Sequence, residues 1–184
     1  MEAALILTEH RDVQARVELD RLARAPNHQS DELRQAATWG LAKAGSGVYQ
    51  EFLDRLNDEN DAVVIHAVSG FGPDTPIHIV KELIAVIQKG NTRNRSAASK
   101  ALRLIGSKRV VRALVTAVRG SQESKAWILA TLGRMDPATV RSVLAGDPLL
   151  SELEPMLVLS PSENWMASSE VAEDLRFLLR QHLA

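Results

Sequence analysis

The sequence predicts an all-α protein built as a solenoid, in which short helical units stack along one direction. Apolar residues recur at helical spacing along almost the whole chain, and the alternation typical of a β-strand is absent. A twelve-residue pattern, Arg-x-Ala-Ala-x-x-x-Leu-x-x-x-Gly, occurs twice, with equivalent positions 61 residues apart. The first copy runs from Arg34 to Gly45 and the second from Arg95 to Gly106. A fixed period of this kind is typical of stacked helical repeats.

Two weaker copies of the pattern lie between and after the strong ones. Their glycines are Gly72 and Gly133, so the four glycines are spaced by 27, 34 and 27 residues. The second copy keeps Val68 at the leucine position, and the fourth keeps Leu129. Other residues occupy their arginine and alanine positions: Asp61, Val63 and Val64 in the second copy, and Gln122, Ser124 and Lys125 in the fourth.

Start and stop signals divide the chain into helices. Ser30 precedes two acids that favour a helix N-terminus, and Thr75-Pro76 and Asp136-Pro137 each set a capping residue before a first-turn proline. Glycines at 45, 72, 90, 106, 120 and 146 stand where helices should end. The expected helices span residues 10–24, 31–44, 47–57, 61–71, 76–89, 94–105, 107–119, 121–134, 137–145 and 168–183.

From residue 31 to about 145 these helices form pairs, in which a first helix carries the Ala-Ala motif and a glycine turn leads to a second amphipathic helix. This arrangement resembles HEAT repeats, especially the short variety of phycobilisome-lyase-like proteins. The resemblance rests on Arg34, Ala36, Ala37, Leu41 and Gly45, and on Arg95, Ala97, Ala98, Leu102 and Gly106. It implies a right-handed α-solenoid of about four repeats, whose second helices line a concave face. In that family the concave face usually binds another macromolecule.

The sequence predicts one structural domain with three parts. Residues 1–29 are expected to form N-terminal capping helices, because solenoids need atypical end units to cover exposed apolar faces. Residues 30–146 hold the repeats. Residues 147–184 are expected to form a turn-rich bridge, with prolines at 148, 155 and 161, and then a C-terminal capping helix. The alternative is that this last helix detaches from the repeats and binds a partner.

Composition excludes several classes of protein. The 184-residue chain has no cysteine, so disulfides, thiolate zinc sites and thiol nucleophiles are excluded. No stretch approaches the length of a membrane-spanning helix, and the N-terminus is acidic where a signal peptide is basic. We therefore expect a soluble cytoplasmic protein without a membrane partner.

The net charge of −1 hides a strong asymmetry. Residues 83–122 contain nine basic residues and no acid, whereas residues 49–82 contain seven acids and two bases. Within 107–119, Arg109, Arg112, Thr116 and Arg119 lie on one side of the expected helix, opposite a valine and leucine stripe. The matching helix of the first repeat carries Glu51, Asp54, Arg55 and Asp58, so the groove is expected to change sign along its length.

These charges predict a site for an acidic protein partner. Arginine suits carboxylates and phosphates, and we expect Arg109, Arg112 and Arg119 to contact the partner, with Arg93, Arg95 and Arg103 as outer support. Charge reversal at Arg112 and Arg119 should then abolish partner capture without loss of helicity. The simpler alternative is a solvated helix face that pairs with neighbouring acids. Nucleic acid is the other possible ligand, although it favours continuous positive charge.

Trp39 and Trp127 are 88 residues apart and hold equivalent places in repeats one and four, with His66 and Lys100 between them. Tryptophan often anchors interfaces, so both are candidate partner contacts. The alternative is that each indole fills the seam beside an end repeat.

No catalytic constellation is evident. The five histidines form no His-x-x-x-His pair, and there is no Gly-x-Ser-x-Gly elbow. Deoxyhypusine hydroxylase also resembles HEAT repeats but uses His-Glu dipeptides for iron, and this chain has none. HEAT-like DNA repair glycosylases stay open as an alternative, because they use a basic concave face with tryptophans. The sequence thus favours a non-enzymatic protein-binding scaffold that needs no metal or cofactor.

Overall fold

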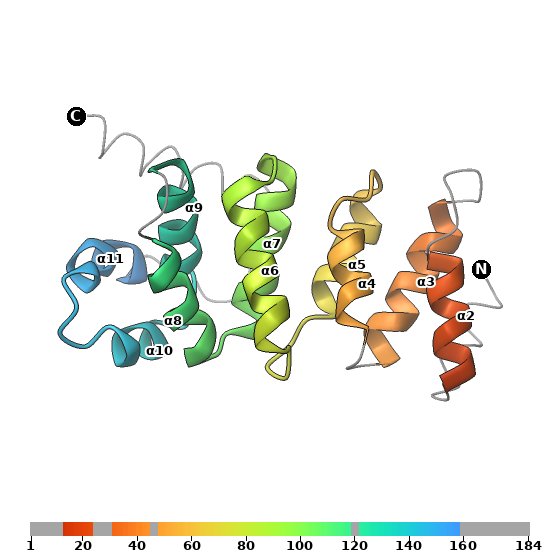
Figure 1. Cartoon of the computed structure of the whole chain (residues 1–184), viewed down its shortest axis with the longest axis horizontal. Helices are drawn as coiled ribbons and strands as arrows, with labels where there is room; N and C mark the ends of the chain where they lie inside the picture. Colours follow the sequence, from red (N-terminus) through yellow and green to blue (C-terminus); the bar gives the residue numbers. More distant parts are fainter. Residues whose placement is uncertain (1–12, 24–30, 45–47, 119–121, 159–184) are drawn as a thin grey trace. The chain divides into compact units, whose positions relative to one another are not determined.

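The computed structural model describes residues 13–23, 31–44, 48–118 and 122–158. In these residues the regular structure consists of ten α-helices with no strand, which confirms the predicted all-α class (Figure 1). The chain divides into two compact units, Met1–Thr75 and Pro76–Ala184. This division adds a boundary that the sequence does not predict. The expected helix 168–183, Ser30, Gly45, Gly120 and Arg119 lie outside the described residues.

The described part of the first unit contains four helices. They are α2 (Val13–Ala23), α3 (Asp31–Ala44), α4 (Tyr49–Arg55) and α5 (Asp61–Ser69). Helix α3 packs against both α2 and α5, and α4 packs against α5. The core is aliphatic apart from the rings of Phe52 and Phe71, which are 1% and 4% exposed and meet edge-on with ring centroids 5.7 Å apart. Edge-to-face rings add to the apolar burial that holds small helical units together.

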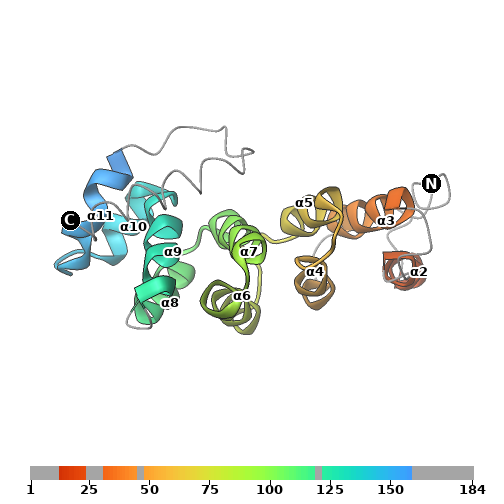
Figure 2. The ribbon, with the colours of Figure 1, turned by 90° about the horizontal axis from the view of Figure 1, so that it is seen from above.

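The second unit contains α6 (Ile77–Lys89), α7 (Thr92–Ile105), α8 (Lys108–Ala117), α9 (Gln122–Gly133), α10 (Pro137–Val143) and α11 (Leu149–Val158). Figure 2 shows α6 and α8 in one row and α7 and α9 in a second row against them. Helix α8 also packs against α10, and α11 packs against α9 and α10. Four helices thus form two layers around one core.

The repeated alanine and leucine positions lie in the cores, apart from Ala36, which is half-buried. Ala37 and Leu41 are at most 1% exposed in the first unit, and Ala97, Ala98 and Leu102 at most 4% exposed in the second. Small side chains on the contact face let neighbouring helices approach closely. Val63 and Val64, which replace the alanines in the second copy, are buried as well. The pattern therefore encodes a packing surface rather than a binding site.

Two of the predicted glycine stops in the described residues hold and two do not, since α10 ends at Val143 with Leu144 as its C-cap and does not continue to Gly146. Gly90 caps α6, and Gly106 caps α7 in the left-handed conformation with φ of 57°, which glycine adopts without strain. The prediction that α5 continues to Gly72 is wrong. Helix α5 ends at Ser69 with Gly70 as its C-cap, and the chain then enters a turn.

One predicted cap is confirmed and another is wrong. Asp136 caps α10 by accepting a hydrogen bond of 2.8 Å from the Thr139 backbone N–H, ahead of Pro137. Hydrogen bonds from Thr139 hold the pKa of Asp136 below its ordinary value. Thr75 does not cap α6. Its buried hydroxyl instead donates to the Gly72 carbonyl at 2.7 Å and accepts from the Gly72 N–H at 3.1 Å, which closes the turn before Pro76.

The structure also differs from the predicted turn-rich bridge, because residues 149–158 form α11 with Pro155 inside it. Proline lacks an N–H and normally breaks a helix interior. Here tertiary packing offsets that penalty, since Leu153 and Leu157 are at most 3% exposed. Salt bridges from Lys125 to Glu152, at 3.1 Å, and from Arg141 to Glu154, at 2.8 Å, hold the helix at its polar side.

Gly133, the last residue of α9, is a point of close approach between α9 and α11. A Cβ atom at this position would lie 2.8 Å from the Cβ of Met156. This distance is shorter than real contacts between Cβ atoms. Because the Cβ of Met156 is fixed to the backbone, α11 itself would have to move. The glycine at the end of the fourth copy therefore serves the docking of a helix that the sequence does not predict.

We predict that Gly133→Ala lowers the free energy of unfolding by about 1–3 kcal/mol, because the added methyl group overpacks the contact with Met156. Chemical denaturation followed by circular dichroism measures the change. The matched control is Gly72→Ala, because a Cβ at Gly72 has no atom within 4 Å. That control should change stability by less than about 0.5 kcal/mol. Equal effects of the two substitutions would contradict the close approach.

Candidate functional site

Helix α8 has one buried and one exposed side, as the sequence predicts. Val110, Val111 and Leu114 are 0% exposed. Lys108, Arg109, Arg112 and Thr116 are exposed on the opposite side. The predicted burial of Val115 and Val118 is only partial, since both are half-buried near the end of the helix. The cations of α8 thus project into solvent from a well-packed helix.

The first turn of α8 is unfavourable for the helix by itself. It carries Lys108 and Arg109 and no acid, and the N-cap Ser107 makes no side-chain capping hydrogen bond. The positive end of the helix dipole disfavours cations at this end, by about 0.3–1 kcal/mol for each charge. Lys108 and Arg112 make no ion pair within the part of the chain that the structure describes. Nothing described in the protein therefore neutralises these two charges.

Helix α6 extends the positive surface. Its exposed residues include Lys81 and Lys89. The exposed residues of α6 and α8 include one acid, Glu82. Both helices lie in the same row and bury their apolar sides against the α7–α9 row, so their exposed sides face away from it (Figure 2). We call this surface the basic face: Lys81, Lys89, Lys108, Arg109 and Arg112.

The other predicted arginines are placed differently. Arg93 and Arg103 lie on α7 and are half-buried. Arg95 is only 8% exposed. Its Nε donates to the Gly90 carbonyl at 2.7 Å and its Nη2 to the Gln88 carbonyl at 3.4 Å. Arg95 therefore satisfies carbonyls at the C-terminal end of α6, a structural role that differs from the predicted support of a partner.

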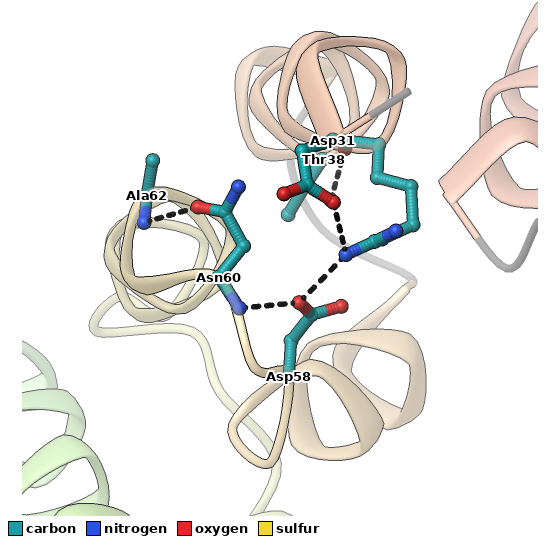
Figure 3. Close-up of polar contacts among 6 residues, drawn as sticks. Asp31, Thr38, Asp58, Asn60 and Ala62 are labelled. Carbon is teal, nitrogen blue, oxygen red and sulfur yellow. Dashed lines mark hydrogen bonds and ion pairs between the residues drawn. The ribbon is translucent and has the colours of Figure 1, made fainter. Parts of the chain in front are cut away.

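The equivalent arginine of the first copy is structural as well. Arg34 is 4% exposed, and its Nη2 lies 2.9 Å from Asp31 Oδ1 and 3.2 Å from Asp58 Oδ1. Asp58 also accepts from the Asn60 N–H at 2.9 Å, and the Asn60 side chain caps α5 by accepting from the Ala62 N–H at 2.9 Å (Figure 3). This chain of contacts joins α3 to the start of α5.

The network changes the interpretation of the acidic helix. Asp58 was expected to face a partner in the groove, but its side chain is 13% exposed and occupied by Arg34 and Asn60. Glu51 is half-buried, and Asp54 is exposed. Of the three acids predicted for that part of the groove, Asp58 therefore belongs to the interior.

We predict that Asp58→Ala lowers the free energy of unfolding by about 1–3 kcal/mol, because the buried Arg34 guanidinium loses one of two carboxylate acceptors and keeps only the exposed Asp31. The readout is the denaturant midpoint. Asp54→Ala removes an exposed acid of neighbouring sequence and should cost less than about 0.5 kcal/mol. A small effect at Asp58 would show that the network contributes little.

The two tryptophans have different surroundings. Trp127 is 6% exposed inside α9, and its carbonyl accepts from the Thr131 hydroxyl at 2.7 Å. Trp39 is half-buried on α3, with Lys43 Nζ 5.8 Å from its ring centroid. Trp127 is thus a core residue, which agrees with the seam-filling alternative, and Trp39 keeps an accessible edge. Neither belongs to the basic face.

His66 holds the place in α5 that is equivalent to Trp39 in α3. Partial burial lowers its pKa below the ordinary value of 6.5. The neutral imidazole is therefore favoured in the folded protein more than in the unfolded chain.

Because the pKa of His66 is lower in the folded state, its stabilising contribution is present above pH 6.5 and is lost as pH falls through the folded pKa. We predict that the free energy of unfolding falls between about pH 7.5 and 5.5, and that His66→Gln reduces this dependence. Denaturation at several pH values and NMR titration of the imidazole measure both quantities. A His66 pKa at or above 6.5 would contradict the inference.

Lys108 is the residue that sequence reasoning missed in the predicted site. It lies four residues before Arg112, so helical periodicity places both on one side, and that signal could have identified it. Arg119 lies outside the described residues. Of the six predicted arginines, only Arg109 and Arg112 are therefore found together on an exposed surface.

The described residues contain neither a candidate metal site nor a candidate membrane-spanning helix. No group of three or more histidine or acidic side chains is placed there to hold a metal ion. None of the helices from α2 to α11 is long and apolar enough to cross a membrane.

Comparisons with protein-family models, with curated proteins and with solved structures find no match to this chain. The geometry of the basic face is therefore the basis for any statement about function.

Proposed function

We propose that this protein is a non-enzymatic scaffold of the HEAT-like solenoid type that captures an acidic protein partner on the basic face. The observation that carries the proposal is the exposed pair Lys108 and Arg112, whose charges nothing in the described chain neutralises. An acidic partner would neutralise both cations and would relieve the unfavourable first turn of α8.

The support around this surface favours a rigid platform. Val110, Val111 and Leu114 fix α8 in a core that is fully buried, so the cations are presented from an ordered helix. Preorganised groups lose less conformational entropy on binding than mobile ones. The two-row packing of α6 to α9 supports the expected solenoid type, in which second helices form the binding side.

We predict that Lys108→Glu combined with Arg112→Glu abolishes capture of a specific protein from an extract of the source cells. The matched control is Arg21→Glu combined with Lys43→Glu, which changes the net charge equally at two exposed residues of the first unit. Quantitative mass spectrometry compares the proteins retained by each form. The basic-face variant should keep its helicity and melt no lower, because an acid in the first turn favours a helix.

Loss of the same protein from both variants would show that capture follows net charge, and the proposal would be wrong. Nucleic acid is the competing ligand. Tight binding of DNA or RNA that weakens by orders of magnitude between about 50 and 200 mM salt, and that is lost in the basic-face variant, would favour that ligand instead.

A further inference from the structure

The spacing of the cations on α8 limits what can lie against them. Lys108 and Arg112 are four residues apart on one exposed side of a helix. With a rise of about 1.5 Å per residue, the two side chains leave the helix about 6 Å apart along its axis. The exposed residue one turn further on, Thr116, is uncharged, and its hydroxyl donates to the Arg112 carbonyl at 3.0 Å. The described cationic strip on α8 is therefore about one helical turn long.

An extended peptide matches this strip. Side chains two residues apart in an extended segment lie on the same side and about 6.6 Å apart, since each residue rises about 3.3 Å. Two carboxylates in an acid-x-acid sequence would thus reach Lys108 and Arg112 together. Arg112 can hold its carboxylate with two parallel hydrogen bonds, which fixes the position of the segment.

A partner helix fits less well. Helices dock through apolar residues at i, i+3, i+4 and i+7, which need an apolar surface on the other side. The exposed residues of α8 are Lys108, Arg109, Arg112 and Thr116, and none is apolar. On α6 the exposed apolar residues are Ile77 and Ala85, which do not supply the stripe of four apolar residues that a docked helix needs. Nucleic acid also fits less well, because specific complexes make many phosphate contacts, or stack bases on aromatic rings, and α6 and α8 carry no Phe, Tyr or Trp.

We propose that the basic face binds an extended acidic protein segment in which acids alternate with other residues, with one carboxylate on Lys108 and the next on Arg112. This inference rests on the proposed function and specifies its partner. Arg109 and Lys89 add positive potential around the segment, which speeds association more than it strengthens binding.

The test compares two short fluorescein-labelled peptides of identical composition by anisotropy, using the full chain. In one peptide glutamate and threonine alternate. In the other, adjacent glutamate pairs are separated by runs of threonine, so no two glutamates are two residues apart. We expect the alternating peptide to bind about tenfold more tightly at low salt, since only it engages both cations with adjacent side chains. Single-stranded DNA is the third probe.

The variants locate the binding. Lys108→Gln and Arg112→Gln should each remove most of the preference for the alternating peptide, whereas Arg21→Gln and Lys43→Gln should leave it unchanged. Replacing every second glutamate by glutamine in the alternating peptide, so that no acid-x-acid pair remains, should weaken binding to the native protein, but should have little further effect on the Arg112→Gln variant. Such a cycle tests the pairing itself and not only the charge.

Several outcomes would overturn the inference. Equal affinities for the two peptides would show that only net charge matters, and tighter binding of DNA than of either peptide would assign the basic face to nucleic acid. If protein capture from the extract depends on Lys108 and Arg112 while the peptides bind equally, the scaffold function stands and the extended acidic segment is wrong. If the control variants lose capture as well, both proposals fail.

Discussion

The rest of each unit depends on the close packing of its central helices through small and aliphatic side chains. Helices α3 and α7 hold alanine and leucine where neighbouring helices cross, and α9 is buried over most of its length. Because these helices are covered by others, α8 needs to bury only one side. The opposite side is left to solvent, and its residues are not selected by packing. The exposure of the basic face is thus a consequence of which helices occupy the covered row.

Arginines in this protein have two distinct physical roles. Arg34 and Arg95 hold equivalent places in the two strong copies, and both are almost completely buried. One is held by carboxylates and the other by helix-end carbonyls, so in each case the charge has acceptors inside the unit. Burial of a guanidinium is tolerated only when such acceptors exist. Within the described residues Arg112 has no such acceptor and its side chain is exposed, which separates the binding candidates from the structural arginines.

The exposed cations of α8 oppose the local stability of their own helix. Cations in the first turn and an N-cap without a capping hydrogen bond both disfavour the helix N-terminus. Lys108 has no ion pair within the described residues to offset this cost, and local rules that are broken in this way tend to mark functional sites. The buried aliphatic side of α8 supplies the stability that its first turn lacks, so the helix forms despite these exposed cations.

The sequence by itself determined the helical class, most helix positions and the amphipathic character of α8, because these follow from local periodicity and from capping chemistry. The stop at Gly106 and the cap at Asp136 are local in the same sense. Tertiary structure alone decided which charged residues are accessible. Arg95 and Asp58 look like surface residues in the sequence, and they are interior because acceptors and donors distant along the chain surround them. Tertiary structure also decided that the residues around Pro155 form a helix. Apolar contacts and the space left by Gly133 outweigh the tendency of proline to break a helix.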